Sequence, residues 1–305
     1  GRSGILPHMR AREQSDLPAR LPGPAWRESL PFALTLCALT AFSFLSGGYI
    51  LTRAAPVATA WLVIAAAVLW VVRSWRRPSW LYLGALAALA GYTAWAGLSI
   101  LWSFGPDLSW VAFDYAAFYL AVATLLGAVA TGPQQLRFAG YGYLIVSVVV
   151  AGYAFAGKVL PDVLTHAHTY ARLDSPVGYW NVLALLMVMA LPAALSLAAR
   201  RGAPPVVRAA GAAAAVPIAF TFVFSFSRGG VLALLVALVA YFVLADRRLA
   251  SVAALAAVVA PVALALWQVR GLDTLFSATG DAALRTAQGR DLLRWALAAL
   301  AVTFA

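Results

Sequence analysis

Charged residues and cysteine are both scarce in this chain. Only 11% of its 305 residues are charged, whereas 63% are hydrophobic. Soluble domains are nearer half apolar and about a quarter charged, so the composition argues against a soluble globular protein. The single cysteine, Cys37, excludes an internal disulfide framework and a cysteine-based metal site.

Several catalytic signatures are also missing. The sequence holds no Walker motif, no glycine-rich dinucleotide loop and no Gly-x-Ser-x-Gly elbow. It has no acidic pair of the kind that holds a divalent ion beside a diphosphate. His166 and His168 are close in sequence, but no acidic cluster lies beside them. We therefore expect no metal and no cofactor, and any phosphate ligand must be bound by arginines.

Apolar runs of helical length are abundant. About 20 mostly apolar residues span a bilayer as a helix, whereas barrel strands alternate over roughly 10 residues. We predict an all-α integral membrane protein with about nine to ten transmembrane helices, the tenth starting near Arg290. The first nine spans are expected at 31–51, 54–72, 80–102, 109–130, 138–156, 180–198, 206–226, 229–244 and 249–269.

The predicted spans divide the chain into four parts. Residues 1–8 resemble a tag or linker remnant, and residues 9–29 have the composition of a disordered cytoplasmic tail. The transmembrane bundle is expected at 30–269. Residues 270–305 are expected to form the start of an extracytoplasmic loop and the next helix. Because no cap or polar tail precedes Ala305, we expect the native protein to continue beyond it.

The net charge of +11 comes mainly from arginines in short loops. Membrane topology explains such charge better than nucleic acid does, so no nucleic-acid partner is expected. With the N-terminus in the cytoplasm, the outer loops up to the ninth span carry only Arg53, Lys158, Arg172 and Arg228. The inner loops carry Arg73, Arg76, Arg77, Arg137, Arg200, Arg201, Arg208, Arg247 and Arg248. The positive-inside rule therefore predicts a multi-pass protein with a cytoplasmic N-terminus.

Two short polar segments interrupt the apolar pattern on the predicted outer side. The first polar segment, 172–181, leads into a span, and the second, 225–230, opens a later one. Arg228 lies between apolar runs at the membrane boundary, where an unpaired charge costs a few kcal/mol. We predict that the two segments meet and bind an anionic, phosphate-bearing ligand.

The residue types in these segments suit a diphosphate. Guanidinium groups match phosphate oxygens in bidentate geometry, so Arg172 and Arg228 are the predicted binding residues. Helix starts attract anions, and glycines allow close backbone approach. The predicted supporting residues are Ser227, Gly229, Gly178, Asn181 and Asp174. Two alternatives remain open: a snorkelling Arg228, and an Arg172 paired with Asp174 or Asp162.

The motif pattern resembles the bacterial O-antigen ligase and O-antigen polymerase family. The resemblance covers roughly residues 30–300. It rests on Arg172, Gly178 and Asn181 at the head of one span, and on Phe-Ser-Phe-Ser-Arg-Gly-Gly opening a later one. It implies a metal-independent inverting glycosyltransferase with a glycosyltransferase-C-like bundle in the bacterial inner (cytoplasmic) membrane.

The same resemblance implies a reaction. A glycan would move from an undecaprenyl-diphosphate carrier to a lipid or polysaccharide acceptor at the outer face, among membrane lipids, in lipopolysaccharide or cell-surface polysaccharide biosynthesis. Family arginines that match Arg172 and Arg228 contact the donor diphosphate.

The chain departs from the ligase pattern in one respect. Ligases carry an essential histidine in a large outer loop after the ninth span, whereas residues 270–305 contain no histidine. The catalytic residue is therefore unassigned, and the expected histidine would lie beyond Ala305. Ligase, polymerase and protein O-glycosylating relatives share these motifs. A transporter or flippase of a lipid-linked anionic substrate and a membrane scaffold are the competing hypotheses.

Overall fold

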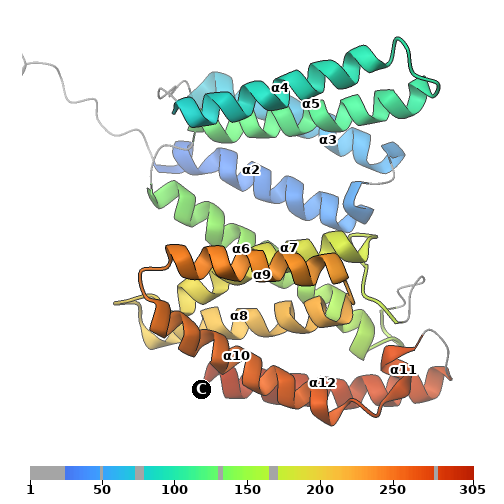
Figure 1. Ribbon diagram of the computed structural model, residues 1–305, viewed down its shortest axis with the longest axis vertical. Helices are drawn as coiled ribbons and strands as arrows, with labels where there is room; N and C mark the ends of the chain where they lie inside the picture. The colour runs from blue at the N-terminus through green and yellow to red at the C-terminus, as the bar shows by residue number, and fades with distance from the viewer. Residues whose placement is uncertain (1–24, 49–50, 73–78, 130–132, 165–170, 278–280) are drawn as a thin grey trace, which may run out of the picture.

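The computed structural model describes residues 25–48, 51–72, 79–129, 133–164, 171–277 and 281–305. Throughout these ranges all regular structure is helical (Figure 1), which confirms the predicted all-α class. In order, the elements are α2 (Ala25–Phe44), η1 (Ser46–Gly48), α3 (Leu51–Val72), α4 (Trp80–Ser99), α5 (Pro106–Val129), α6 (Pro133–Val159), α7 (Trp180–Ala198), α8 (Pro205–Phe224), α9 (Arg228–Leu244), α10 (Arg248–Gln268), α11 (Asp273–Phe276) and α12 (Ala282–Phe304).

Each of the nine predicted spans overlaps one long helix, from α2 to α10, but some ends differ by several residues. The first span was predicted to end at Leu51, whereas α2 ends at Phe44 and Leu51 begins α3. Helix α2 begins at Ala25, so the last residues of the predicted tail are helical. Helix α12 begins at Ala282, ahead of the predicted start near Arg290. Its cap explains the difference, because the Asp281 carboxylate accepts a hydrogen bond from the Ala283 amide at 3.3 Å. Hydropathy marks where an apolar run begins, not where a cap starts the helix.

The helices have the composition and exposure expected of a membrane protein. In the described ranges, six are long and apolar enough to cross a membrane: α4, α5, α6, α7, α8 and α10. Large apolar side chains cover the outside, among them Trp80, 88% exposed, and Leu244, 81% exposed. Water does not stabilise such a surface, whereas lipid does. The chain is therefore a helical membrane protein.

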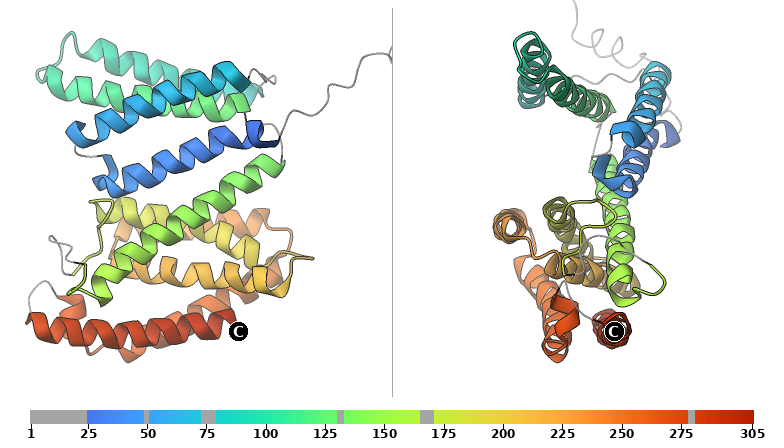
Figure 2. Two further views of the ribbon diagram at one scale, coloured as in Figure 1. Left: turned by 180° about the vertical axis from the view of Figure 1, so that it is seen from behind. Right: turned by 90° about the vertical axis from the view of Figure 1, so that its right-hand side faces the viewer.

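Helix α6 links two groups of helices (Figures 1 and 2). Helices α2 to α5 lie on one side of it and α7 to α12 on the other, while α6 runs obliquely between them. The main core lies among α6, α7, α8, α10 and α12, where Leu183, Met187 and Phe220 are fully buried. A smaller core around Trp61 and Leu125 holds α2, α3 and α5 together.

The alternating helices place their connections at two ends of the molecule (Figure 1). At one end, called the site end, α6 and α8 finish and α7, α9 and α12 begin, so it contains both polar segments. At the opposite end lie the α7–α8 and α9–α10 turns and the start of α6.

Candidate functional site

The first polar segment is an ordered turn attached to the end of α8. The Leu173 amide donates a hydrogen bond to the Phe224 carbonyl at 2.9 Å, and the Leu173 and Val177 side chains are buried. The Gly178 amide donates to the Asp174 carbonyl at 2.7 Å, which closes a turn containing the cis Ser175–Pro176 peptide. The backbone of this loop is therefore fixed by α8 and by its own apolar side chains.

Gly178 lets this turn lie against the end of α2. Its φ of +85° is in the left-handed region that favours glycine. A Cβ atom here would lie 3.3 Å from the Ser46 Cβ and 3.4 Å from the Ser46 carbonyl oxygen. Glycine is therefore required at position 178 by the backbone conformation and by the close contact with η1.

A chain of hydrogen bonds joins the starts of α7 and α9. The Asn181 amide nitrogen donates to the Tyr179 hydroxyl at 2.7 Å, and the Ser227 hydroxyl donates to the Asn181 amide oxygen at 2.7 Å. The Ser227 oxygen also accepts from the Gly230 amide at 2.8 Å and thereby caps α9. Ser227 is only 4% exposed. The two polar segments, predicted to meet, are in direct contact.

The two glycines after Arg228 have different surroundings. A Cβ atom at Gly230 would lie 2.8 Å from the Ala184 Cβ and 3.0 Å from the Ser227 hydroxyl oxygen, so glycine allows α9 to approach α7. At Gly229 the same position has no atom within 4 Å apart from the chain neighbours and the nearby backbone of α9 itself. Gly230 therefore serves packing, whereas Gly229 leaves backbone open to an approaching ligand.

Phe226 has an uncommon backbone conformation between the two helices. Its φ is +48°, a region that residues other than glycine seldom adopt and that often occurs at functional sites. Its ring lies 6.3 Å from the Phe224 ring and 6.3 Å from the Phe276 ring. These aromatic contacts hold the turn that leads into Arg228.

Both predicted binding arginines are exposed at the site end. The Arg172 guanidinium lies 5.1 Å from the centre of the Trp180 ring, which is within cation–π range. Trp180 is the first residue of α7. Arg228 is the first residue of α9, where helix amides add partial positive charge. Of the two alternative partners of Arg172, Asp174 and Asp162, the structure pairs Asp162 with Arg290 at 3.2 Å. Diphosphate binding by Arg172 and Arg228 stays a prediction.

Lys158, predicted from the sequence only as one of the outer-loop charges, is a buried cation. Its Nζ donates to the Ala171 carbonyl at 3.2 Å and lies 5.3 Å from the centre of the Phe224 ring. A buried charge is costly without such partners, so Lys158 ties the end of α6 to the first polar segment. One sequence signal was available: it is the only lysine in an arginine-rich chain, directly after an apolar run.

Two histidines and one carboxylate were also considered from the sequence. His166 and His168 lie outside the described residues. Asp114 is half-buried within α5, among the helices on the far side of α6. In the ranges that the structure describes, no three His, Cys, Asp or Glu side chains gather to form a possible metal site.

The geometry provides the starts of two helices, two exposed arginines and a partly buried chain of hydrogen bonds that joins the two helix starts. Such an arrangement has the chemistry to bind an anion, because guanidinium groups and free helix amides both donate hydrogen bonds to oxyanions. Comparisons with family models, with curated proteins and with solved structures give no match for this chain. The functional assignment therefore depends on this geometry and on the motif resemblance.

Proposed function

We propose that this chain is a metal-independent inverting glycosyltransferase of the O-antigen ligase type. In this proposal it moves a glycan from an undecaprenyl-diphosphate carrier to an acceptor at the outer face of the bacterial inner membrane. Nine or ten helices span that membrane in a glycosyltransferase-C-like bundle, with the N-terminus in the cytoplasm. The observation that carries the proposal is the 2.7 Å hydrogen bond between Asn181 and Ser227, which joins the two arginine-bearing segments.

The chemistry of the proposed step suits the charges at the site. The acceptor hydroxyl oxygen attacks the anomeric carbon from the face opposite the carrier, and the bond from that carbon to the diphosphate oxygen breaks. Negative charge grows on the leaving diphosphate, so preorganised donors at Arg172, Arg228 and the start of α9 lower the barrier. The carrier bond is already activated, and no nucleotide is needed.

The hydroxyl proton must pass to a base. The family resemblance implies a histidine for this step, and residues 270–305 contain none. The proposal therefore assigns donor binding and leaving-group stabilisation to the described site, and leaves the base unassigned.

An apolar cavity beside the site suits a lipid carrier. It has a volume of about 290 Å³, lies among α7, α8, α9 and α10, and is lined only by apolar side chains. Phe222 and Val223, in the last turn of α8, belong to this lining, and only Phe224 separates them from the Ser225–Ser227 turn. Part of a prenyl chain fits there while its diphosphate lies at the arginines. An O-antigen-type polymerase would use the same arrangement.

A flippase or transporter of the same lipid-linked anion is the second hypothesis. Transporters bind substrate near the membrane midplane, between broken helices. Here α7, α8 and α10 continue as helices through Pro192, Pro217 and Pro261. Unbroken helices favour a fixed donor site over alternating access.

The direct test replaces each binding arginine in the full-length protein. We expect Arg172→Ala and Arg228→Ala to abolish surface glycan in a strain that lacks its own copy of the gene, because the diphosphate loses a charged contact. Immunoblots of membranes should show normal amounts of protein. Arg270→Ala is the matched control, since Arg270 is also exposed at the site end and also lies over a tryptophan, 3.8 Å from the Trp267 ring centre. Wild-type glycan in both site variants would contradict the proposal.

A further inference from the structure

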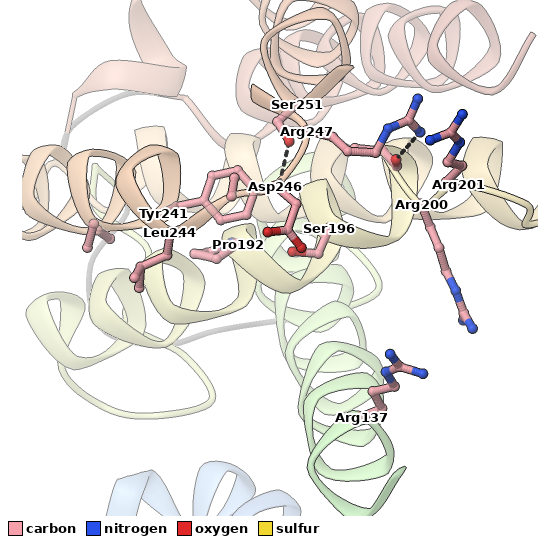
Figure 3. Close-up of a pocket in the computed structure, with 14 residues that line it drawn as sticks. Arg137, Pro192, Ser196, Arg200, Arg201, Tyr241, Leu244, Asp246, Arg247 and Ser251 are labelled. Carbon is pink, nitrogen blue, oxygen red and sulfur yellow. Dashed lines mark hydrogen bonds between the residues drawn. The ribbon is translucent and has the colours of Figure 1, made fainter. Parts of the chain in front are cut away.

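A second basic site lies at the opposite end of the molecule (Figure 3). There the α7–α8 and α9–α10 turns and the start of α6 surround an open cleft of about 1030 Å³. Four arginines line it, Arg137, Arg200, Arg201 and Arg247, against a single carboxylate, Asp246. In Figure 3 the Arg200 side chain extends toward Arg137, while Arg201 and Arg247 extend to one side of the cleft.

Hydrogen bonds to uncharged groups position two of these arginines without neutralising their charge. An Arg200 Nη donates to the Tyr141 hydroxyl at 3.1 Å, and an Arg247 Nη donates to the Ala199 carbonyl at 3.0 Å. Across the described ranges, ion pairs join Arg290 to Asp162 and Arg294 to Asp291, and none includes an arginine of this cleft. Like charges gathered in one cleft repel, so an anion that enters it gains more than at an isolated surface arginine.

The walls of the cleft distinguish a lipid from a soluble anion. Ala237, Ala240 and Leu244 of α9 line one side, and beyond them α9 presents an exposed apolar face through Val239 and Val243. Near the arginines the Tyr241 and Ser251 hydroxyls are hydrogen-bonded at 2.8 Å. A ligand with a phosphate, a hydroxylated head and apolar chains matches the arginines, the hydroxyls and the α9 face together.

We propose that this cleft binds the headgroup of an anionic phospholipid, with its phosphodiester at the arginines and its acyl chains along α9. Basic pockets between helices at a membrane surface bind anionic headgroups in this way. The proposal is independent of the glycan-transfer hypothesis, because the cleft lies at the other end of the bundle and needs no donor or acceptor.

The test measures lipid retention by the full-length protein, purified in detergent, by native mass spectrometry. Dioleoylphosphatidylglycerol and dioleoylphosphatidylcholine are added in equal amounts, and inorganic phosphate is added in a separate arm. We expect clear preference for phosphatidylglycerol. The double variant Arg200→Gln with Arg247→Gln should bind phosphatidylglycerol with an affinity roughly 30-fold lower, which is the combined effect of two arginines beside an anionic headgroup.

The matched control is Arg208→Gln with Arg248→Gln. Both of these arginines lie at the same end and donate to backbone carbonyls, yet neither lines the cleft. This control should retain phosphatidylglycerol like the parent chain. The double variant Arg200→Lys with Arg247→Lys keeps both charges and should retain phosphatidylglycerol partly. It provides the test if the glutamine variant does not fold.

Three results would overturn the lipid proposal. Equal retention of the two lipids by the parent chain would do so without any variant. An equal loss in the cleft and control variants would show that net charge alone matters. Displacement of phosphatidylglycerol by inorganic phosphate at equal concentration would show that the cleft recognises a free anion instead.

Discussion

Among single residues, the neighbouring glycines at the start of α9 separate packing from ligand approach. We expect Gly230→Ala to lower the free energy of unfolding by about 1–3 kcal/mol, because its methyl group would meet Ala184 at 2.8 Å. Gly229→Ala should change stability by less than about 0.5 kcal/mol, since that position faces open space. Thermal unfolding of the purified protein measures both.

Glycan transfer should depend on Gly229, the glycine whose substitution leaves stability almost unchanged. If a diphosphate approaches the start of α9, Gly229→Ala reduces glycan transfer in a protein of normal stability. Full activity in Gly229→Ala would show that the ligand does not approach the backbone at Gly229.

Residue types at the site were predictable, whereas their contacts were not. The arginines, glycines and Ser227 stand out because polar residues interrupt apolar runs. The hydrogen-bond partners of Ser227 and Lys158 depend on which distant segments the tertiary fold brings beside them. The Ser227 hydroxyl donates to Asn181, which lies 46 residues earlier, across the α7–α8 hairpin. The Lys158 Nζ donates to the Ala171 carbonyl, in a loop 13 residues later. Neither contact has a periodic signal in the sequence.

On the scale of secondary-structure elements, the loop before α7 depends on its contact with η1. Gly178→Ala should lower the free energy of unfolding through a left-handed backbone that costs alanine about 1–2 kcal/mol, and also through the 3.3 Å approach to Ser46. Gly202→Ala is the matched control, because Gly202 has a φ of +71° and no atom of the described chain within 4 Å. The excess loss in Gly178→Ala, measured by thermal unfolding, reports the η1 contact, and equal losses would mean that this contact contributes nothing.

The helices themselves were predictable because each contains a long apolar run, and in six of the described helices that run is long enough to cross a bilayer. Where prediction and structure differ, polar residues decide the boundary. The Asp281 cap extends α12 over Arg285 and Gln288, which the hydropathy pattern assigned to a loop. The helical class follows from the apolar runs, while helix ends follow from local hydrogen bonds, and a count of nine to ten membrane spans stays a prediction.

For the whole molecule, the account requires the two polar segments to face away from the cytoplasm. In a Cys37→Ser background, Gly229→Cys should react with a membrane-impermeant maleimide in spheroplasts, whereas Arg201→Cys should react only after the membrane is permeabilised. The two positions lie at opposite ends of the bundle, and both are exposed. Labelling of Arg201→Cys alone in sealed spheroplasts would invert the topology and place the site in the cytoplasm, where the proposed reaction has no acceptor.

The central claim is that Arg172 and Arg228 act together on one diphosphate. The most direct measurement is the affinity of the full-length protein for undecaprenyl diphosphate, in phosphatidylcholine nanodiscs with a chelator present. We expect Arg172→Gln and Arg228→Gln each to weaken binding tenfold or more, as loss of a charged hydrogen bond worth roughly 1.5–3 kcal/mol implies, while Arg270→Gln binds like the parent. The double variant should lose less than the product of the two single losses, because both arginines contact the same ligand. Unchanged affinity in both single variants, or binding that the chelator abolishes, would contradict the account.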